Sequence, residues 1–367
     1  MSKSMSKRLL FVAGGTGGHL FPALAVAARC RQLQPDSVIE FVGTRGRMEE
    51  KIVPREGYPL NFLWISGLER KISLKTLLFP LKLVVAVAQA LRLIGRFRPD
   101  AVICAGAYVS WPMGIAARMR RVPLVLMASD ARPGLALSKL AAKASQIHVA
   151  FDSAAGHFRA LGARCPILLS GNPVRSNLLA SHDAAHARQH FGLHPDRPTL
   201  FAFGGSLGAR SVNNALDAVA DKLRADGIQL IWQTGTSYAG PELKEPDLYR
   251  STFINEMELA YAAADLVVAR AGAMTVSELA VVGKPSVLVP LPIETVHQRQ
   301  NAEAIQAAGG GVMVADNQIV EQLYPVVSGL LADRQRLAEM GSKVAALAVR
   351  DADERIAQAI VEIGKRK

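Results

Sequence analysis

Residues 9–20 read LLFVAGGTGGHL, and residues 199–209 read TLFAFGGSLGA. In each stretch an apolar run typical of a buried strand ends in a glycine-rich loop, and a helical pattern follows the loop. A strand, a glycine loop and a helix in this order open a Rossmann-like unit. Because the order recurs about 190 residues later, the sequence predicts two such units rather than one long sheet.

Length and composition agree with two domains. The chain has 367 residues, which is more than a single hydrophobic core usually serves. Its residues are 50% hydrophobic, enough for two globular cores. Short β-rich runs alternate with helical stretches, as expected for an α/β fold with parallel sheets. A turn-forming tripeptide, Gly171-Asn172-Pro173, marks the boundary. We expect an N-terminal domain over residues 1–172, a C-terminal domain over 173–341 and a closing helix over 342–367.

The charge distribution and the cysteines indicate which partners and which cell compartment to expect. Residues 1–180 contain 25 Lys+Arg and 9 Asp+Glu, whereas the rest contains 18 and 22. The basic half is expected to face phospholipid or a phosphorylated substrate. No nucleic-acid partner is expected, because the chain has no zinc finger, RNA-recognition motif or basic heptad array. The three cysteines, which are odd in number and far apart, suit reduced thiols in a cytoplasm.

Residues 74–94 form an apolar stretch that is interrupted by charges and a proline. The charges disqualify it as a transmembrane helix. On a helix, Lys71, Lys75 and Lys82 would share a narrow stripe beside several leucines, which indicates an interfacial surface for anionic lipid. An ordinary core helix with a basic, solvated edge explains the pattern equally well.

Neither glycine loop completes a known nucleotide motif. Both place backbone N–H groups and a helix dipole at one spot, where a diphosphate could bind without a metal. Leu20 stands where the G-x-G-x-x-G motif needs a glycine, and residues 43–45, after the second strand, include no acid that could bind a ribose. Both observations argue against an NAD dehydrogenase. No P-loop motif occurs. A glycine turn that merely packs a helix on a strand remains an alternative for either loop.

The second loop also fits the nucleophile elbow of α/β-hydrolases. Gly204–Gly208 satisfies G-x-S-x-G between a strand and a helix. Asp265 or Glu278, followed by His297, would complete a triad with Ser206 in the hydrolase order. Against this interpretation stands the complete α/β half that precedes the loop, which a hydrolase would not need.

Further polar groups follow the strand that ends at Ala269. Residues 270–278 open a helix at a carboxyl edge of the sheet, where ligands bind in open α/β folds. Thr275 and Glu278 alternatively form a capping box with a purely structural role. Three further polar residues would lie on one face of a helix: His297, Gln298 and Asn301. Their side chains could bind sugar hydroxyls, or they could simply face solvent.

His19, at the mouth of the first loop, is a candidate base for an attacking hydroxyl, or else a cap for backbone groups. The one D-x-D, Asp351-Ala352-Asp353, lies in the terminal helical segment and not after a strand. We interpret it as a solvated face, and no metal is predicted.

Taken together, these segments resemble the bacterial MurG family of UDP-N-acetylglucosamine transferases, which convert lipid I to lipid II. The matching motifs, in chain order, are Gly14–His19 with Pro22-Ala23, Tyr108–Ser110, Gly171–Arg175, Gly204–Ser206, Arg270–Glu278, and His297-Gln298 with Asn301. They cover nearly the whole chain.

The resemblance implies a GT-B fold, with two Rossmann-like domains facing a cleft and a C-terminal helix that crosses back. It implies a hexosyltransferase of peptidoglycan synthesis that transfers N-acetylglucosamine with inversion and needs neither metal nor other cofactor. The acceptor, lipid I, would bind the N-terminal domain at the anionic cytoplasmic face of the inner membrane. The protein would be peripheral there, with other cell-wall synthesis proteins as potential partners.

The family's site residues carry over onto matching positions. Arg175 and Ser206 would contact the donor diphosphate, Ile254 the uracil, Glu278 the ribose, and Gln298 with its neighbours the N-acetylglucosamine. The implied donor residues are Thr16, Gly17, Gly18, Arg175, Ser206, Ile254, Ala273, Met274, Thr275, Glu278, His297, Gln298 and Asn301. The implied acceptor residues are Thr16, His19, Tyr108 and Ser110.

Two departures from the family concern the acceptor. Met127–Asp130 stands where the family has an H-E-Q-N-like run, so a glutamate of the acceptor site is missing, and Trp111 replaces a small residue. The first hypothesis is that the C4 hydroxyl of the muramyl sugar, deprotonated by His19 or Asp130, attacks the anomeric carbon of UDP-N-acetylglucosamine. The alternatives are a serine hydrolase that uses Ser206 and a UDP-sugar-binding relative with a different acceptor.

Overall fold

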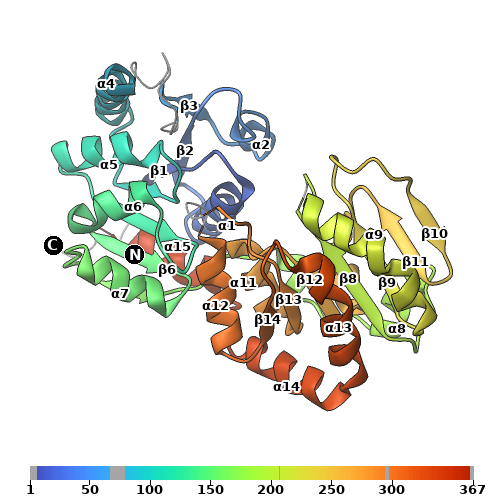
Figure 1. Ribbon diagram of the computed structural model, residues 1–367. Helices are drawn as coiled ribbons and strands as arrows, with labels where there is room; N and C mark the ends of the chain where they lie inside the picture. Colours follow the sequence, from blue (N-terminus) through green and yellow to red (C-terminus); the bar gives the residue numbers. More distant parts are fainter. Residues whose placement is uncertain (1–5, 67–78, 206, 294–296, 364–367) are drawn as a thin grey trace. The chain divides into compact units, whose positions relative to one another are not determined.

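The computed structural model describes residues 6–66, 79–205, 207–293 and 297–363. These residues form two compact units (Figure 1). The N-terminal unit takes the described residues up to Pro173 together with those from Asp351 onward, and the C-terminal unit takes Val174–Arg350. The end of the chain therefore belongs to the unit in which the chain begins.

The N-terminal unit is built on a seven-stranded sheet with the order β3-β2-β1-β4-β5-β6-β7, and all its neighbouring strands are parallel. Its strands are β1 Arg8–Val12, β2 Val38–Gly43, β3 Leu60–Phe62, β4 Ala101–Cys104, β5 Leu124–Ala128, β6 Gln146–Val149 and β7 Ile167–Leu169. Every residue of β4 and β5 is buried, because helices cover both faces of a parallel sheet.

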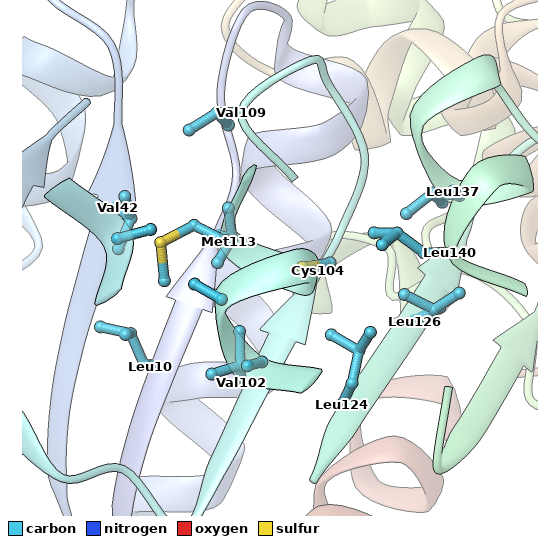
Figure 2. Close-up of a cluster of buried hydrophobic side chains, with 14 of the residues drawn as sticks. Leu10, Val42, Val102, Cys104, Val109, Met113, Leu124, Leu126, Leu137 and Leu140 are labelled. Atoms are coloured by element: carbon cyan, nitrogen blue, oxygen red, sulfur yellow. The ribbon is translucent and has the colours of Figure 1, made fainter. Parts of the chain in front are cut away.

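The helices of this unit enclose two apolar layers. They are α1 Gly17–Leu33, α2 Glu49–Arg55, α4 Phe79–Phe97, α5 Ser110–Met119, α6 Leu135–Leu140, the short η1 Ala141–Lys143, α7 Asp152–Ala160 and α15 Ala352–Glu362. Figure 2 shows part of one layer, in which Met113 of α5 joins Leu10 and Val102 from neighbouring strands. In the other layer, Ile356 and Ile360 of α15 are buried with the apolar residues of α1.

The C-terminal unit repeats this plan with the sheet order β10-β11-β9-β8-β12-β13-β14. Only the hairpin β10–β11 is antiparallel among the strand pairs described. Its strands are β8 Thr199–Phe203, β9 Gln229–Gln233, β10 Leu243–Glu245, β11 Leu248–Ser251, β12 Leu266–Ala269, β13 Ser286–Leu288 and β14 Gly311–Met313. Its helices are η2 Ser176–Leu179, α8 Ala184–His190, α9 Arg210–Ala225, α10 Met257–Ala263, α11 Ala273–Val282, α12 Gln298–Ala307, α13 Ile319–Ala332 and α14 Arg334–Ala345.

The strand order places both glycine loops at a topological switch point. The chain turns from one side of the sheet to the other between β1 and β4, and again between β8 and β12. Crevices at the carboxyl ends of such strands are the ligand sites of open α/β sheets. The loop after β1 and the loop after β8 lie at these two places, so each unit has one candidate site of its own.

Two expectations need a correction or a limit. The closing segment is expected from the sequence to begin at Ser342, but that residue lies inside α14, and the units divide between Arg350 and Asp351. Of the apolar stretch over residues 74–94, the part before Phe79 lies outside the described residues. Within the described part of the chain, no helix is both long and apolar enough to cross a membrane.

Candidate active site

His19 lies in the first turn of α1, on the glycine loop after β1. Its Nδ1 is 3.2 Å from the hydroxyl of Thr16, which is the N-cap residue of the helix. The imidazole packs on Gly106, beyond β4, where an added Cβ would lie 2.4 Å from the His19 ring. Gly106 also has a φ of +118°, which side-chain-bearing residues rarely adopt. Glycine at this position is therefore what allows the ring to lie against the neighbouring strand end.

The surroundings of His19 favour a neutral imidazole. Burial lowers its pKa below the ordinary value, while the negative charge of Asp130 and a hydrogen bond with the Gly14 backbone oppose that shift. Asp130 directly follows Ser129, at the end of β5. A neutral imidazole at neutral pH can accept a proton, and a carboxylate nearby stabilises the imidazolium that results. The pair predicted from sequence is thus electrostatically linked in the N-terminal unit.

Glu49, which sequence reasoning missed, anchors the first glycine loop. Its side chain is fully buried, and its carboxylate accepts hydrogen bonds from Gly15 N (3.1 Å), Thr44 N (3.0 Å) and Thr44 Oγ1 (2.9 Å). No acid that could bind a ribose stands directly after the second strand, at 43–45, and Glu49 is the first residue of the next helix. Because Glu49 occupies the Gly15 amide, that N–H is not available to a phosphate.

Tyr108 and Ser110 follow β4 and have different surroundings. The Tyr108 hydroxyl is 3.4 Å from Thr44 Oγ1, and the residue is partly exposed. Ser110 is fully buried, and its hydroxyl donates to the carbonyl of Gly106. The Ser110 hydroxyl thus supports the turn that receives His19, and the acceptor role that the resemblance implies for Ser110 stays a prediction.

The second glycine loop lies tightly against the end of β9. A Cβ on Gly208 would come within 2.1 Å of the Thr234 carbonyl oxygen, and Gly208 has a φ of +84°. The Gly208 amide donates to Gly205 O at 3.0 Å. Only glycine permits this approach. Ser206, the proposed contact to the diphosphate, lies outside the described residues.

Gln233, the last residue of β9, joins two parts of the donor region. Its Oε1 accepts from the Ile254 backbone N–H at 3.0 Å, and its Nε2 donates to Gly205 O at 3.3 Å. Ile254, the residue expected to meet the uracil, is itself buried. Nothing in the local sequence singles out Gln233, because its two partners come from other segments.

Glu278, in the second turn of α11, contacts Arg175 and Tyr261. Tyr261 donates to Glu278 Oε2 at 3.0 Å, and Arg175 Nε lies 3.7 Å from Oε1. Burial raises the pKa of Glu278, and the Arg175 charge and the Tyr261 hydrogen bond counteract the rise. The capping-box alternative is wrong, because α11 begins at Ala273 with Gly272 as its N-cap. Arg175 and Glu278 are therefore brought together as one charged site.

Three of the remaining donor candidates lie in the N-terminal unit at the start of α1: Thr16, Gly17 and Gly18. The others lie at the starts of α11 and α12. Gln298 Oε1 accepts from Leu291 N at 2.9 Å. Asn301 is fully buried and donates to Ala271 O at 3.1 Å, so it supports the turn before α11. His297 is the N-cap of α12 with a φ of 52°. The first turn of α11 comprises Ala273, Met274 and Thr275, of which the last two are partly exposed.

The positions of the two candidate acids argue against a hydrolase triad with Ser206. Asp265 precedes β12 and therefore lies at the amino edge of the sheet, opposite the glycine loop after β8. There it forms a two-pronged pair with Arg188 at 2.9 Å and accepts from Thr199 N at 2.8 Å. Glu278, the other candidate acid, is held by Arg175 and Tyr261. Among the described residues, no three His, Cys, Asp or Glu side chains gather as they would around a metal ion.

Comparison with known proteins assigns each unit to a family model. Residues 9–149 match the glycosyltransferase family 28 N-terminal domain, and residues 199–356 match the glycosyltransferase family 28 C-terminal domain. Among solved structures, MurG of Acinetobacter baumannii aligns with a TM-score of 0.77 at 28% identity, covering 96% of this chain and 99% of that one. The calicheamicin glycosyltransferase CalG4, at 15% identity and a TM-score of 0.71, shares the fold. The fold is GT-B.

Curated relatives match over nearly the full length. A protein of Cytophaga hutchinsonii is 38% identical over 99% of this chain and 98% of its own length, and one of Nocardioides sp. is 41% identical over 97% and 98%. Both are named UDP-N-acetylglucosamine--N-acetylmuramyl-(pentapeptide) pyrophosphoryl-undecaprenol N-acetylglucosamine transferase. Since identity at this level extends through both units, the chain belongs to this MurG family of glycosyltransferases.

Proposed function

We propose that this protein transfers N-acetylglucosamine from UDP-N-acetylglucosamine to the C4 hydroxyl of the muramyl sugar of lipid I, which yields lipid II for peptidoglycan. The names of the full-length relatives support this reaction. The observation that carries the proposal is the pairing of Arg175 with buried Glu278 at the switch point of the C-terminal unit. These are the residues that the resemblance leads us to expect at the diphosphate and the ribose.

On the acceptor side, His19 acts as the general base. Its neutral imidazole takes the proton of the C4 hydroxyl while the hydroxyl oxygen forms a bond to the anomeric carbon of the donor. The bond between that carbon and the diphosphate oxygen breaks, and UDP leaves with the electron pair. Asp130 stabilises the imidazolium, and Thr16 orients the ring through Nδ1. The attack on the face opposite the diphosphate inverts the anomeric centre.

On the donor side, positive charge comes from the protein itself. The N-termini of α9 and α11 present backbone N–H groups and helix dipoles at the switch point. Arg175 adds a full charge for the departing diphosphate, and Glu278 accepts from the ribose hydroxyls. The Ile254 segment meets the uracil, and Gln298 meets the N-acetylglucosamine. A metal ion is not required in this scheme.

A direct assay tests the proposal. The protein is incubated with UDP-N-acetylglucosamine and a lipid I analogue in the presence of EDTA, and both UDP release and the disaccharide lipid are measured. We expect both products at equal amounts. Tight binding of the UDP-sugar with no transfer to any muramyl lipid would reject the reaction in favour of a relative with another role. Labelling of Ser206 by a fluorophosphonate would instead support the hydrolase.

We also propose that the protein works at the membrane surface, which follows from the acceptor's lipid anchor. In support, α4 exposes Leu81 and Val84, and Lys82 lies over the ring of exposed Trp64 at 5.7 Å. Co-sedimentation with anionic vesicles tests this proposal. Changing Leu81 and Val84 to serine should weaken binding, whereas Val320→Ser, at an exposed valine on α13, should not.

A further inference from the structure

Glu49 has an unusual environment for a carboxylate. It is fully buried at the start of α2, and among the ion pairs of the described residues none includes it. A buried charge without such a partner is costly unless hydrogen-bond donors surround it. Three donors do so, and they come from the two loops that follow β1 and β2.

The backbone around Glu49 is shaped to receive it. A Cβ on Gly14 would lie 2.4 Å from Glu49 Oε1, and a Cβ on Gly43 would lie 2.6 Å from its Cγ. A side chain at either strand end would therefore displace the Glu49 carboxylate from its present position between them. Gly15, whose amide it binds, has a φ of +81°, so the hydrogen bond holds a turn that an unanchored loop would readily leave.

Two short paths lead from Glu49 to the acceptor groups. Gly15 precedes Thr16, whose hydroxyl contacts His19 Nδ1 at 3.2 Å. Thr44, which gives Glu49 two hydrogen bonds, has its hydroxyl 3.4 Å from that of Tyr108. One carboxylate thus fixes the loop that carries the base and the threonine that contacts Tyr108.

We propose that Glu49 is a positioning residue for the transfer reaction, which holds His19 and Tyr108 in place without touching either substrate. This inference rests on the proposed function. Because Glu49 anchors the loop that carries the base, its loss should lower kcat. The KM for UDP-N-acetylglucosamine should change much less than kcat, because Arg175 and Glu278, the residues expected at the diphosphate and the ribose, lie in the C-terminal unit, whereas only residues 16–18 of this loop are expected to meet the donor. If the first loop were instead a cradle for the donor diphosphate, that KM would rise.

The test compares Glu49→Gln with Glu50→Gln. The amide that the first change introduces has a single accepting oxygen. This oxygen should stay on Thr44, which gives two hydrogen bonds, so the amide nitrogen faces the Gly15 N–H and the loop loses its anchor at nearly constant side-chain volume. Glu50, the next residue, accepts from Gly46 N at 2.6 Å and lies outside this network. We expect Glu49→Gln to lower kcat about 10- to 100-fold, as misplacement of a catalytic group does, and Glu50→Gln to leave kcat nearly unchanged.

A second pair of variants covers the case in which Glu49→Gln does not fold. Thr44→Val removes the shared hydroxyl at constant volume, and Thr44→Ser retains it. Thr44→Val should lower kcat, whereas Thr44→Ser should have a kcat close to that of the wild type. A kcat close to wild type for both Glu49→Gln and Thr44→Val, or a raised KM for the UDP-sugar at unchanged kcat, would overturn the inference.

Hydrogen exchange separates failure of this inference from failure of the proposed function. In the full-length protein, amide exchange of the peptide over residues 13–20 should speed up in Glu49→Gln and not in Glu50→Gln. If wild type shows no transfer to lipid I, the proposed function fails, and faster exchange still supports the anchoring role. Unchanged exchange in Glu49→Gln contradicts the anchoring role, whatever the activity.

Discussion

Asp130, which follows β5, acts on His19 through its charge. Its negative charge raises the pKa of His19 against the larger, opposite effect of burial. In Asp130→Asn the imidazole pKa should therefore fall further, and the base should weaken. We expect the acidic limb of the kcat–pH profile to move to lower pH, with kcat reduced about tenfold.

The control for Asp130→Asn is Asp36→Asn, at an exposed aspartate of the same unit. Asp36→Asn should leave the profile unchanged, and NMR titration of His19 should report the same downward shift in Asp130→Asn. An acidic limb that stays in place, or moves upward, would show that Asp130 does not act on the base.

Arg175 has a corresponding influence on Glu278. Burial raises the pKa of Glu278, and the Arg175 charge lowers it. Arg175→Ala should therefore raise that pKa further, so the carboxylate form of Glu278, which we propose accepts from the ribose, is lost at a higher pH. Affinity for UDP-N-acetylglucosamine, measured by calorimetry, should weaken about 10- to 100-fold at neutral pH, since a hydrogen bond to a charged group contributes about 1.5–3 kcal/mol. The acidic limb of the affinity–pH profile should move to higher pH.

Arg334→Ala serves as the matched change for Arg175→Ala. Arg334 is exposed at the start of α14, in a hollow lined by residues of the sheet's amino edge, away from the donor loops. Its loss should alter neither the affinity nor its pH dependence. If the two variants behaved alike, the effect of Arg175 would be one of net charge and not of its contact with Glu278.

At the scale of elements, the second glycine loop and β9 must approach backbone to backbone. Gly205 and Gly208 both have left-handed φ values, of +88° and +84°, but only Gly208 would place a Cβ against neighbouring atoms. Gly205→Ala should thus cost only the conformational term of about 1–2 kcal/mol. Gly208→Ala should also push the loop off β9.

Calorimetric titration with UDP-N-acetylglucosamine distinguishes the two glycine variants. We expect Gly208→Ala to lose much more affinity than Gly205→Ala and to unfold at a lower temperature. Equal losses would mean that the conformation of the loop, and not its contact with Thr234, sets the donor site.

At the scale of the whole molecule, the end of the chain completes the unit that begins it. Ile360 of α15 is fully buried in the same apolar layer as α1, and Asp353 pairs with Arg29 at 3.0 Å. Ile360→Ala should destabilise the N-terminal unit by about 2–5 kcal/mol, as large-to-small core changes do. The control Gln358→Ala, at an exposed position of the same helix, should not.

Scanning calorimetry measures how much Ile360→Ala lowers the stability of the protein. Calorimetric titration with UDP-N-acetylglucosamine measures whether the change also alters donor affinity. Because the residue lies outside Val174–Arg350, the affinity should stay within about twofold of wild type, as distant independent sites usually do not couple. A large loss of donor affinity would mean that the two units do not behave independently.

The repeated strand, glycine loop and helix order was sufficient to predict two parallel-sheet units, and the ligand sites expected at the two loops stay predictions. The strand expected over residues 199–203 and the turn at 171–173 agree with β8 and with the division between the units. These features depend on neighbouring residues: alternation of apolar runs, helix periodicity and the left-handed backbone that glycine allows. They are properties of short stretches, which is why the sequence by itself determined them.

The partners of the site residues were decided by the tertiary structure alone. Glu49, Gln233 and Tyr261 bind segments far from them in the chain, and Ser110 and Asn301 turned out to be buried supports. No local pattern contains that information, because a hydrogen-bond partner depends on which strand ends the sheet order brings together. The sequence therefore determined which loops could bind ligands, and the packing of the sheets decided which side chains hold those loops in place.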